Sequence, residues 1–458
     1  MPFILPANTL SAGGYDVDNS CIFDRASTDS MSKSMSDGSS IKGTFSAWIK
    51  VDGTGNEMNI LSHFQDTSNV FSIATSGSSV YVVDYNSGYS LQLATNRIMR
   101  DPSAWFHLYV AIDRSQGTAN NRNRIFINGV EETSFSHRTN YGQQTSGGHQ
   151  DAISMNDGDC TMYLGGLGDG NQMFGGYLAE VVWLDGTASA VTNFGEFDED
   201  SGIFKPIDVS GLSSSKGTNG FYLDFEDASN LGNDAFGGTD LTESNIASTN
   251  QTTDTCTNNF AVGNPLVQND LPAFSNGNLT YTSGSNNYKT GLSTIGVSSG
   301  KWFMEVLFVS GSTAIIGVVD EADFSSLNGN TAGAGFTTNS VGYYKDGTKW
   351  IADSESSYGA SYTANDTIGI ALDLDSGTKT VTFYKDGASQ GAINLPTTGT
   401  GTFFFAPGAY NSVLSANYGS PPYAISSGNT DANGYGNFEF TVPSGYYALN
   451  TKNLAEFG

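Results

Sequence analysis

The sequence has little positive charge. Its 458 residues include 19 Lys and Arg against 46 Asp and Glu, which gives a formal net charge of −27. A surface that binds nucleic acid needs an excess of cations to neutralise the phosphates. The balance of charge therefore excludes a nucleic-acid-binding protein.

Cysteine and histidine are also scarce. Cys21, Cys160 and Cys256 are widely spaced and odd in number, so the sequence supports neither a disulfide framework nor a paired-cysteine metal site. We expect three free thiols and a protein made in a reducing compartment. The four histidines show no zinc-ligand spacing with Glu or Cys, which argues against a zinc site.

Long apolar runs are missing. The longest stretches, such as residues 314–319, fall far short of the roughly 20 residues that a membrane-spanning helix needs. The first ten residues contain no Lys or Arg and include Pro6, whereas an export signal has a charged start before an apolar core. The sequence predicts no membrane insertion and no signal peptide, and thus synthesis in the cytoplasm.

Glycine and aromatic residues are abundant, as in all-β proteins with many turns. The chain has 56 glycines, and Phe, Trp and Tyr make up 12% of it. Apolar residues alternate along residues 105–113 and again along 367–375, which predicts strands with one buried face. Gly follows Asn or Asp at 128–129, 346–347 and 386–387, where hairpin turns require positive φ angles. Regular strands closed by such turns favour β-sandwiches.

The pattern lapses between about residues 239 and 272, where Thr, Ser, Asn and Asp dominate. Without apolar alternation, this stretch is predicted to be a polar linker or a strap across the surface. The prediction is a sandwich over residues 1–240, a linker or strap over 241–272, and a second sandwich over 273–458.

Particular segments in each half resemble known families. Residues 43–50, 104–113, 123–130, 163–166 and 176–186 resemble the laminin-G-like, concanavalin A-type family in order and spacing. Residues 300–306, 315–318 and 366–387 resemble a SPRY domain. The resemblance implies an all-β chain with two concanavalin A-like jelly-roll sandwiches in tandem.

The combination of the two modules has an implication of its own. Together with a junction like residues 254–260 and an ending like 447–454, it is similar to proteins of tailed bacteriophages. That setting implies a protein displayed on the virion surface, as a tail fibre, a capsid fibre or a decoration.

The motifs of catalysis are absent or misplaced. Residues 296–300 match Gly-x-Ser-x-Gly, but a strand rather than a helix is predicted to follow, and every histidine precedes Ser298. The carboxylate pattern of sandwich glycosidases is missing, and the pairs Asp224 with Glu226 and Asp373 with Asp375 fit a solvated strand face. We therefore expect no enzymatic activity, and neither ATP nor NAD as a cofactor.

Calcium is the one cofactor for which the sequence offers ligands. Laminin-G-like domains often hold Ca²⁺ at a loop edge, and this ion prefers oxygen ligands. The loops at 155–159 and 167–171 would supply Asp157, Asp159 and Asp169. Asp-Gly pairs such as these also serve simply as turns.

Aromatic residues in loops are the candidate binding groups, because rings stack on sugars and carry polar tips. In the second half the candidates are Tyr343, Tyr344, Trp350, Tyr358 and Tyr362. In the first half they are Tyr85, Tyr89, His137, Arg138 and Tyr141. Packing between strands is the alternative role, and the favoured one for Tyr344 and Trp350.

The sequence thus predicts a non-enzymatic virion surface protein that binds a host-surface glycan or protein receptor through sandwich loops. One alternative is a structural decoration or adaptor of the particle, and a third hypothesis is a polysaccharide-degrading enzyme. Other virion proteins are the expected partners, and we expect a homo-oligomer.

Overall fold

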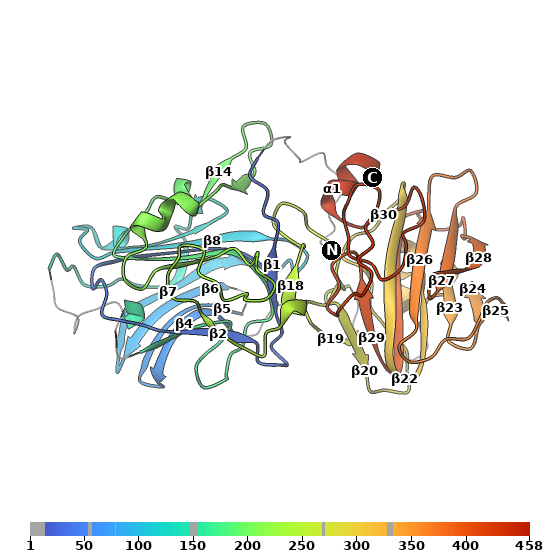
Figure 1. The fold of residues 1–458 in the computed structure, drawn as a ribbon, viewed down its shortest axis with the longest axis horizontal. Coiled ribbons are helices and arrows are strands. Elements are labelled where there is room, and N and C mark those ends of the chain that lie inside the picture. Colours follow the sequence, from blue (N-terminus) through green and yellow to red (C-terminus); the bar gives the residue numbers. More distant parts are fainter. Residues whose placement is uncertain are drawn as a thin grey trace. The chain divides into compact units, whose positions relative to one another are not determined.

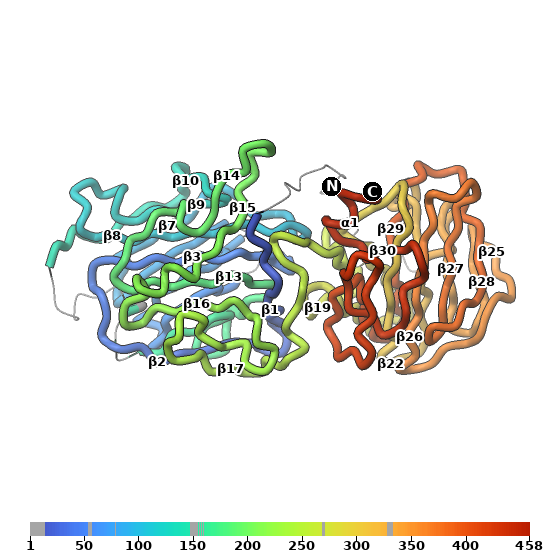
Figure 2. Tube along the Cα trace, turned by 45° about the horizontal axis from the view of Figure 1, so that its top comes forward, coloured from blue at the N-terminus to red at the C-terminus, as the bar shows by residue number. Residues whose placement is uncertain are grey.

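The computed structural model describes residues 14–53, 57–77, 79–146, 154–156, 158, 160–267, 271–327 and 333–458. The chain divides between Thr257 and Asn258 into two units. The colours of Figure 2 show that, in the described chain, the first unit runs from blue to yellow-green and the second from yellow to red. In the described residues, the first unit therefore ends at Thr257 and the second begins at Asn258.

In its described residues, the first unit contains two eight-stranded sheets, which we call sheet A and sheet B. Sheet A has the order β10 (Val130–Glu131), β9 (Asn123–Ile127), β8 (Phe106–Asp113), β3 (Lys42–Val51), β13 (Gly176–Asp185), β1 (Ser20–Phe23) and β18 (Gln251–Thr252), and β16 (Phe221–Leu223) also pairs with β13. Sheet B has the order β11 (Phe135–Thr139), β7 (Tyr89–Ile98), β6 (Ser79–Asn86), β5 (Asn69–Ser76), β4 (Met58–Asp66), β12 (Thr161–Leu164), β2 (Ser30–Ser34) and β17 (Thr242–Ser244). Figure 1 shows β4 to β7 in blue.

Shorter elements complete this unit. β14 (Gly195–Phe197) and β15 (Phe204–Pro206) form a separate hairpin. The connections carry 3-10 helices at Ala119–Asn121, Ser154–Asn156, Val191–Asn193, Ser210–Ser215 and Ser248–Asn250.

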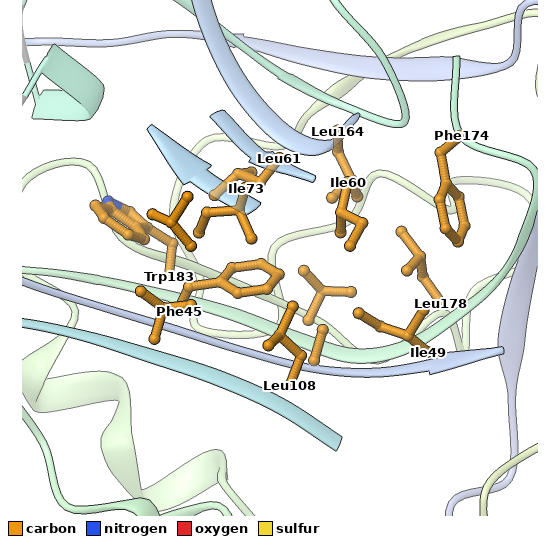
Figure 3. Packing of buried hydrophobic residues seen from close by; sticks show 14 of the residues in the cluster. Phe45, Ile49, Ile60, Leu61, Ile73, Leu108, Leu164, Phe174, Leu178 and Trp183 are labelled. Carbon is orange, nitrogen blue, oxygen red and sulfur yellow. The ribbon is translucent and has the colours of Figure 1, made fainter. Parts of the chain in front are cut away.

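The core of the first unit lies between sheets A and B. Phe45, Leu108 and Leu178 face it from sheet A, and Ile73 and Leu164 face it from sheet B (Figure 3). Strand β8 confirms the predicted alternation, since Phe106, Leu108, Val110 and Ile112 all belong to this cluster. Burial of these side chains is the main stabilising term of such a sandwich.

The segment predicted to be a linker or strap does not stand apart from the two units. Strand β17 pairs with β2, and β18 pairs with β1. The division between the units falls at 257–258, inside this segment, rather than at its two predicted ends. Residues 241–257 thus add edge strands to the first unit, and residue 258 begins the second.

The second unit holds one twelve-stranded sheet in its described residues, bent into two layers by long strands. The path is β19 (Ala273–Ser275), β20 (Thr280–Ser283), β29 (Phe403–Asn417), β22 (Lys301–Asp320), β23 (Ser340–Tyr344), β24 (Thr348–Ile351) and β25 (Ser354–Ser357). Off this path lie β21 (Lys289–Thr290), β26 (Thr367–Asp373), β27 (Thr380–Lys385), β28 (Ala388–Asn394) and β30 (Tyr447–Ala448). A 3-10 helix spans Glu321–Leu327, and the helix α1 spans Thr451–Phe457.

Strand β22 explains how the two layers join. Its first half pairs with β26, and its second half pairs with β23 along the same edge, while β29 follows the other edge from Glu305 to Asp320. Between the halves lies a register shift at Phe308 to Ser310, followed by Gly311 at a φ of 115°. A bulge beside a glycine bends a strand sharply, so one strand serves both layers.

Two further features of the sequence can be compared with the structure, the cysteines and the lack of long apolar runs. None of the three cysteines forms a disulfide in the described residues; Cys21 and Cys160 are buried, and Cys256 is half-buried. No helix in the described residues has the length and apolarity that crossing a membrane requires.

Candidate functional site

A groove of about 1150 Å³ lies on the outer face of sheet B. Strands β4, β5, β6, β7 and β11 line it, together with Glu57 and the loop that follows β12. It is the larger of the two hollows that we compare below, and its lining combines aromatic rings with hydroxyl and amide groups.

Strand alternation places the aromatic floor of the groove. On β6, the side chains of Val80 and Val82 are fully buried in the core. The residues between and after them, Tyr81, Val83 and Tyr85, therefore face outwards, and all three line the groove. One face of this strand thus packs in the core, and its other face lines the groove.

The register between strands brings in residues that are distant in sequence. Ala94 on β7 lies opposite both Tyr81 on β6 and His137 on β11. Residues directly opposite one another in a sheet share a face. Tyr81, Ala94 and His137 therefore form a row across the groove. The pairing of these strands explains why His137 lies in the groove.

Hydrogen bonds and ring contacts fix the floor. The Gln92 amide nitrogen donates to the Tyr81 hydroxyl over 3.0 Å. The rings of Tyr85 and Tyr89 meet edge to face with their centroids 5.0 Å apart. Burial raises the pKa of Tyr81, so this hydroxyl stays protonated at neutral pH.

The loop after β12 forms one wall. Its Gln172 side chain accepts a hydrogen bond from the Asn59 amide over 2.7 Å, and the Ser72 hydroxyl donates to the Asn59 oxygen. Asn59 is only 1% exposed, so the wall is anchored to the sheet through a buried amide. Such second-layer hydrogen bonds hold a binding surface in one geometry.

Three of the predicted binding residues, Tyr85, Tyr89 and His137, come together in this groove. Tyr89 remains 52% exposed, as a ring that stacks on a ligand must be.

Arg138 and Tyr141 lie elsewhere, in contrast to the ligand contacts that the sequence predicts. Arg138 lies opposite the core residue Leu93, and its guanidinium stacks over Phe135 at 4.5 Å and donates to a backbone carbonyl. Tyr141 is 2% exposed, and its hydroxyl donates to the buried Asp84. Both side chains point away from the groove because strand alternation and core packing turn them inwards.

The predicted calcium ligands are only partly described. Asp157 and Asp159 lie outside the described residues. Asp169 lines the groove, and its two carboxylate oxygens accept hydrogen bonds from the backbone and side chain of Asn171 over 3.0 and 2.9 Å. In the described residues, no group of three or more His, Cys, Asp or Glu is arranged to hold a metal ion. Calcium at these loops stays a prediction.

Two predicted binding residues of the second unit belong to its interior. Tyr343 is fully buried and Tyr362 is 1% exposed, with their ring centroids 5.3 Å apart. The Tyr362 hydroxyl donates to the backbone oxygen of Ala314 over 3.0 Å, and that of Tyr343 donates to Ala360. We therefore assign both rings to packing, in contrast to the ligand contact that the sequence predicts.

The other three, Tyr344, Trp350 and Tyr358, are half-buried. The Trp350 ring packs edge to face against Phe336 at 4.7 Å, and the Tyr358 hydroxyl donates to a backbone carbonyl. These contacts fit the packing role that the sequence favours for Trp350.

A separate hollow of about 430 Å³ near Lys379 and Thr400 is lined by turn residues with one aromatic ring, Phe403.

Sequence reasoning missed Phe64, Tyr81 and Gln92 in the groove. A signal for Tyr81 was present, because it shares the alternation of Tyr85 along one strand. For Phe64 and Gln92 there was none, since only the pairing of strands places them on the same face.

Family models match both units. A model described as the concanavalin A-like lectin/glucanases superfamily matches residues 25–191. A model of the SPRY domain matches residues 301–421. The chain thus carries, in tandem, a region that matches the concanavalin A-like superfamily and a region that matches the SPRY domain.

Solved structures with similar parts have low overall similarity. A human SPRY domain is 21% identical, with a TM-score of 0.25, and the match covers 32% of this chain and 94% of that one. A candidate carbohydrate-binding protein from Bacteroides ovatus is 16% identical, with a TM-score of 0.37, over 52% of this chain and 60% of that one. No curated protein matches the chain. The domain assignment therefore stands on the family models and the sheet topology.

Proposed function

We propose that this is a non-enzymatic surface protein of a phage virion, which binds a host-surface glycan through the groove of its concanavalin A-like domain. The observation that carries the proposal is the floor of the groove. Tyr81, Tyr85 and Tyr89 line it beside the amides of Gln92 and Gln172.

This combination suits a sugar better than an apolar ligand. A sugar ring has an apolar face that stacks on an aromatic ring, and hydroxyl groups that need hydrogen-bond partners. The groove supplies both. The Tyr89 ring is 52% exposed, and the loop wall offers the Gln172 side chain, which the buried Asn59 amide holds in place. A rigid sheet holds these groups before the ligand arrives, which reduces the entropy that binding costs.

A non-enzymatic role is supported by the hydrogen bonds and the ion pair that engage the acidic residues Asp224, Asp373 and Asp375. Asp224 accepts a hydrogen bond from the backbone of Glu226 within one turn. Asp373 pairs with Lys301 at 2.8 Å, and Asp375 accepts a backbone hydrogen bond from Gly300 over 2.7 Å. Each of these carboxylates except Glu226 thus has a structural partner in the described chain.

The virion setting is supported by the order of the two domains and by the phage-like junction and ending of the chain. Cryo-EM of intact particles tests it. A position at a tail appendage with the groove outwards would support host attachment. A position within the capsid lattice with the groove covered by a neighbouring chain would favour the structural role of a decoration or adaptor.

Substitution of Tyr85 and Tyr89 tests the groove. In the full-length protein, the double change Tyr85→Ala with Tyr89→Ala should weaken binding on a glycan array by about tenfold or more, because each stacked ring contributes about 0.5–1.5 kcal/mol. Phe197→Ala is the control, since this ring is 50% exposed in the same unit and does not line the groove. Equal loss in both variants, or no glycan binding by the unchanged protein, would contradict the proposal.

A further inference from the structure

The charge of the groove has one sign. Among the described residues that line it, Glu57 and Asp169 are acidic and none is Lys or Arg. Both carboxylates are exposed, so they meet a ligand in solution.

Arginines on the lining strands are occupied elsewhere. Arg138 follows His137 directly, but its guanidinium stacks on Phe135 and donates to the backbone of Asn120. Arg97, near the end of β7, forms an ion pair with Glu132. The absence of Lys and Arg from the described lining of the groove is therefore a consequence of strand register and of ion pairing.

We propose that the groove selects glycans whose bound units are neutral or carry free amino groups, and that it rejects uronate and sulfated units. This inference rests on the proposed function. Among the described lining residues, a carboxylate or sulfate would meet two negative charges and no Lys or Arg, whereas an ammonium group would meet two partners. No Lys or Arg among the described lining residues offsets the cost of taking that negative charge out of water.

The size of the effect follows from Coulomb's law at the surface. A single exposed carboxylate about 6 Å from a ligand charge changes affinity by about threefold in water. Two such groups give about tenfold discrimination, and added salt should weaken it because exposed charges are screened.

An array of matched glycans tests the proposal with the full-length protein. Each neutral oligosaccharide is printed beside its uronate or sulfated counterpart, and each N-acetylated one beside its free amine. We expect binding to neutral and amino members, with acidic counterparts about tenfold weaker at low salt. Acidic members that bind as well as neutral ones would overturn this inference and leave the proposed function intact, whereas a lack of binding to every glycan would overturn the proposed function itself.

A pair of variants locates the source of the discrimination. Glu57→Gln should strengthen binding of acidic members about threefold relative to neutral ones. Glu199→Gln removes the same charge from an exposed turn outside the groove and should leave the ratio unchanged. An equal effect of both changes would assign the discrimination to the net charge of −27 and overturn the proposal.

Discussion

The ammonium nitrogen of Lys50 lies 2.7 Å from a carboxylate oxygen of Asp254, and both side chains are almost completely shielded from solvent, at 0% and 1% exposure. The Trp105 indole donates to the other carboxylate oxygen over 3.0 Å, and the ammonium lies 5.2 Å from the centre of the Tyr177 ring. This pair ties the segment after β18 to a central strand of sheet A. It joins residues 204 positions apart in sequence.

Removal of one partner should be costly, because it leaves the other charge buried. We expect Lys50→Met to lower the free energy of unfolding of the first unit by about 3–5 kcal/mol, measured by urea denaturation. Lys42→Met is the control. Lys42 lies on the same strand, and its ammonium is 3.7 Å from Asp113 with the lysine side chain 40% exposed. Its loss should cost less than about 1 kcal/mol. Similar losses in the two variants would contradict a special role for the buried pair.

The end of the first domain can be tested with fragments. A fragment of residues 1–257 should unfold cooperatively, whereas one of residues 1–240 should be several kcal/mol less stable or fail to fold. The shorter fragment loses Asp254 and also Asn250, whose amide donates to the backbone of Ile22 over 2.8 Å. Thermal unfolding followed by circular dichroism compares the two, and equal midpoints would show that residues 241–257 are dispensable.

Glu180 should make the stability of the first unit depend on pH. Burial raises the pKa of this carboxyl from 4.5 to about 8, with the charge of Asp224 adding to the rise and the Tyr222 hydroxyl, which donates over 2.8 Å, opposing it. The folded state thus keeps a proton that the unfolded chain loses above about pH 4.5. The stability that this proton gives is complete below that pH and is lost as pH rises towards 8, by up to about 1.4 kcal/mol per pH unit.

Glu180→Gln removes the titrating group and keeps an oxygen that can accept from Tyr222. The variant should show a flatter dependence of the unfolding free energy on pH between about 5 and 8 than the unchanged protein. Urea denaturation at several pH values measures both slopes. The same slope in both proteins would show that Glu180 is already ionised in the folded state.

The packing role of Tyr343 predicts a loss of stability without a loss of binding. Its ring meets those of Tyr358, Tyr362 and Phe383 at centroid distances of 5.3 to 5.5 Å. Tyr343→Ala should therefore cost about 3–5 kcal/mol in the second unit, while Tyr344→Ala, at a half-buried ring, should cost less. A variant Tyr343→Ala with unchanged stability and lost glycan binding would restore its predicted contact with a ligand.

The strands of the fold could be predicted where alternation is long and the turn is marked. Strand β8 has four inward apolar residues at period two, and the turn after β9 has Asn128 and Gly129 at φ angles of 49° and 74°. The edge strands β17 and β18 gave no such signal, because they are only three and two residues long. These strands depend on partners more than 200 residues away in sequence, as the hydrogen bond from Asn250 to Ile22 illustrates.

The groove could be predicted only in part for a similar reason. Tyr85 and Tyr89 flank one hairpin turn and were visible as a local aromatic cluster. His137 and Arg138 are neighbours that looked equivalent in sequence, and only the pairing of β11 with β7 separates them. Tyr343 looked like a surface aromatic for the same reason, since the layer that covers it comes from other strands.

A change in the register of β11 would also change which of its side chains faces the groove. Phe135 lies opposite Thr95, and a bulge at Ser136 then sets His137 opposite Ala94. If the bulge relaxed while Phe135 kept its place, His137 would move opposite the core residue Leu93, and Arg138 would move opposite Gln92 on the groove face. A guanidinium would then replace the imidazole, and we would expect the groove to accept the acidic sugars that our proposal has it reject.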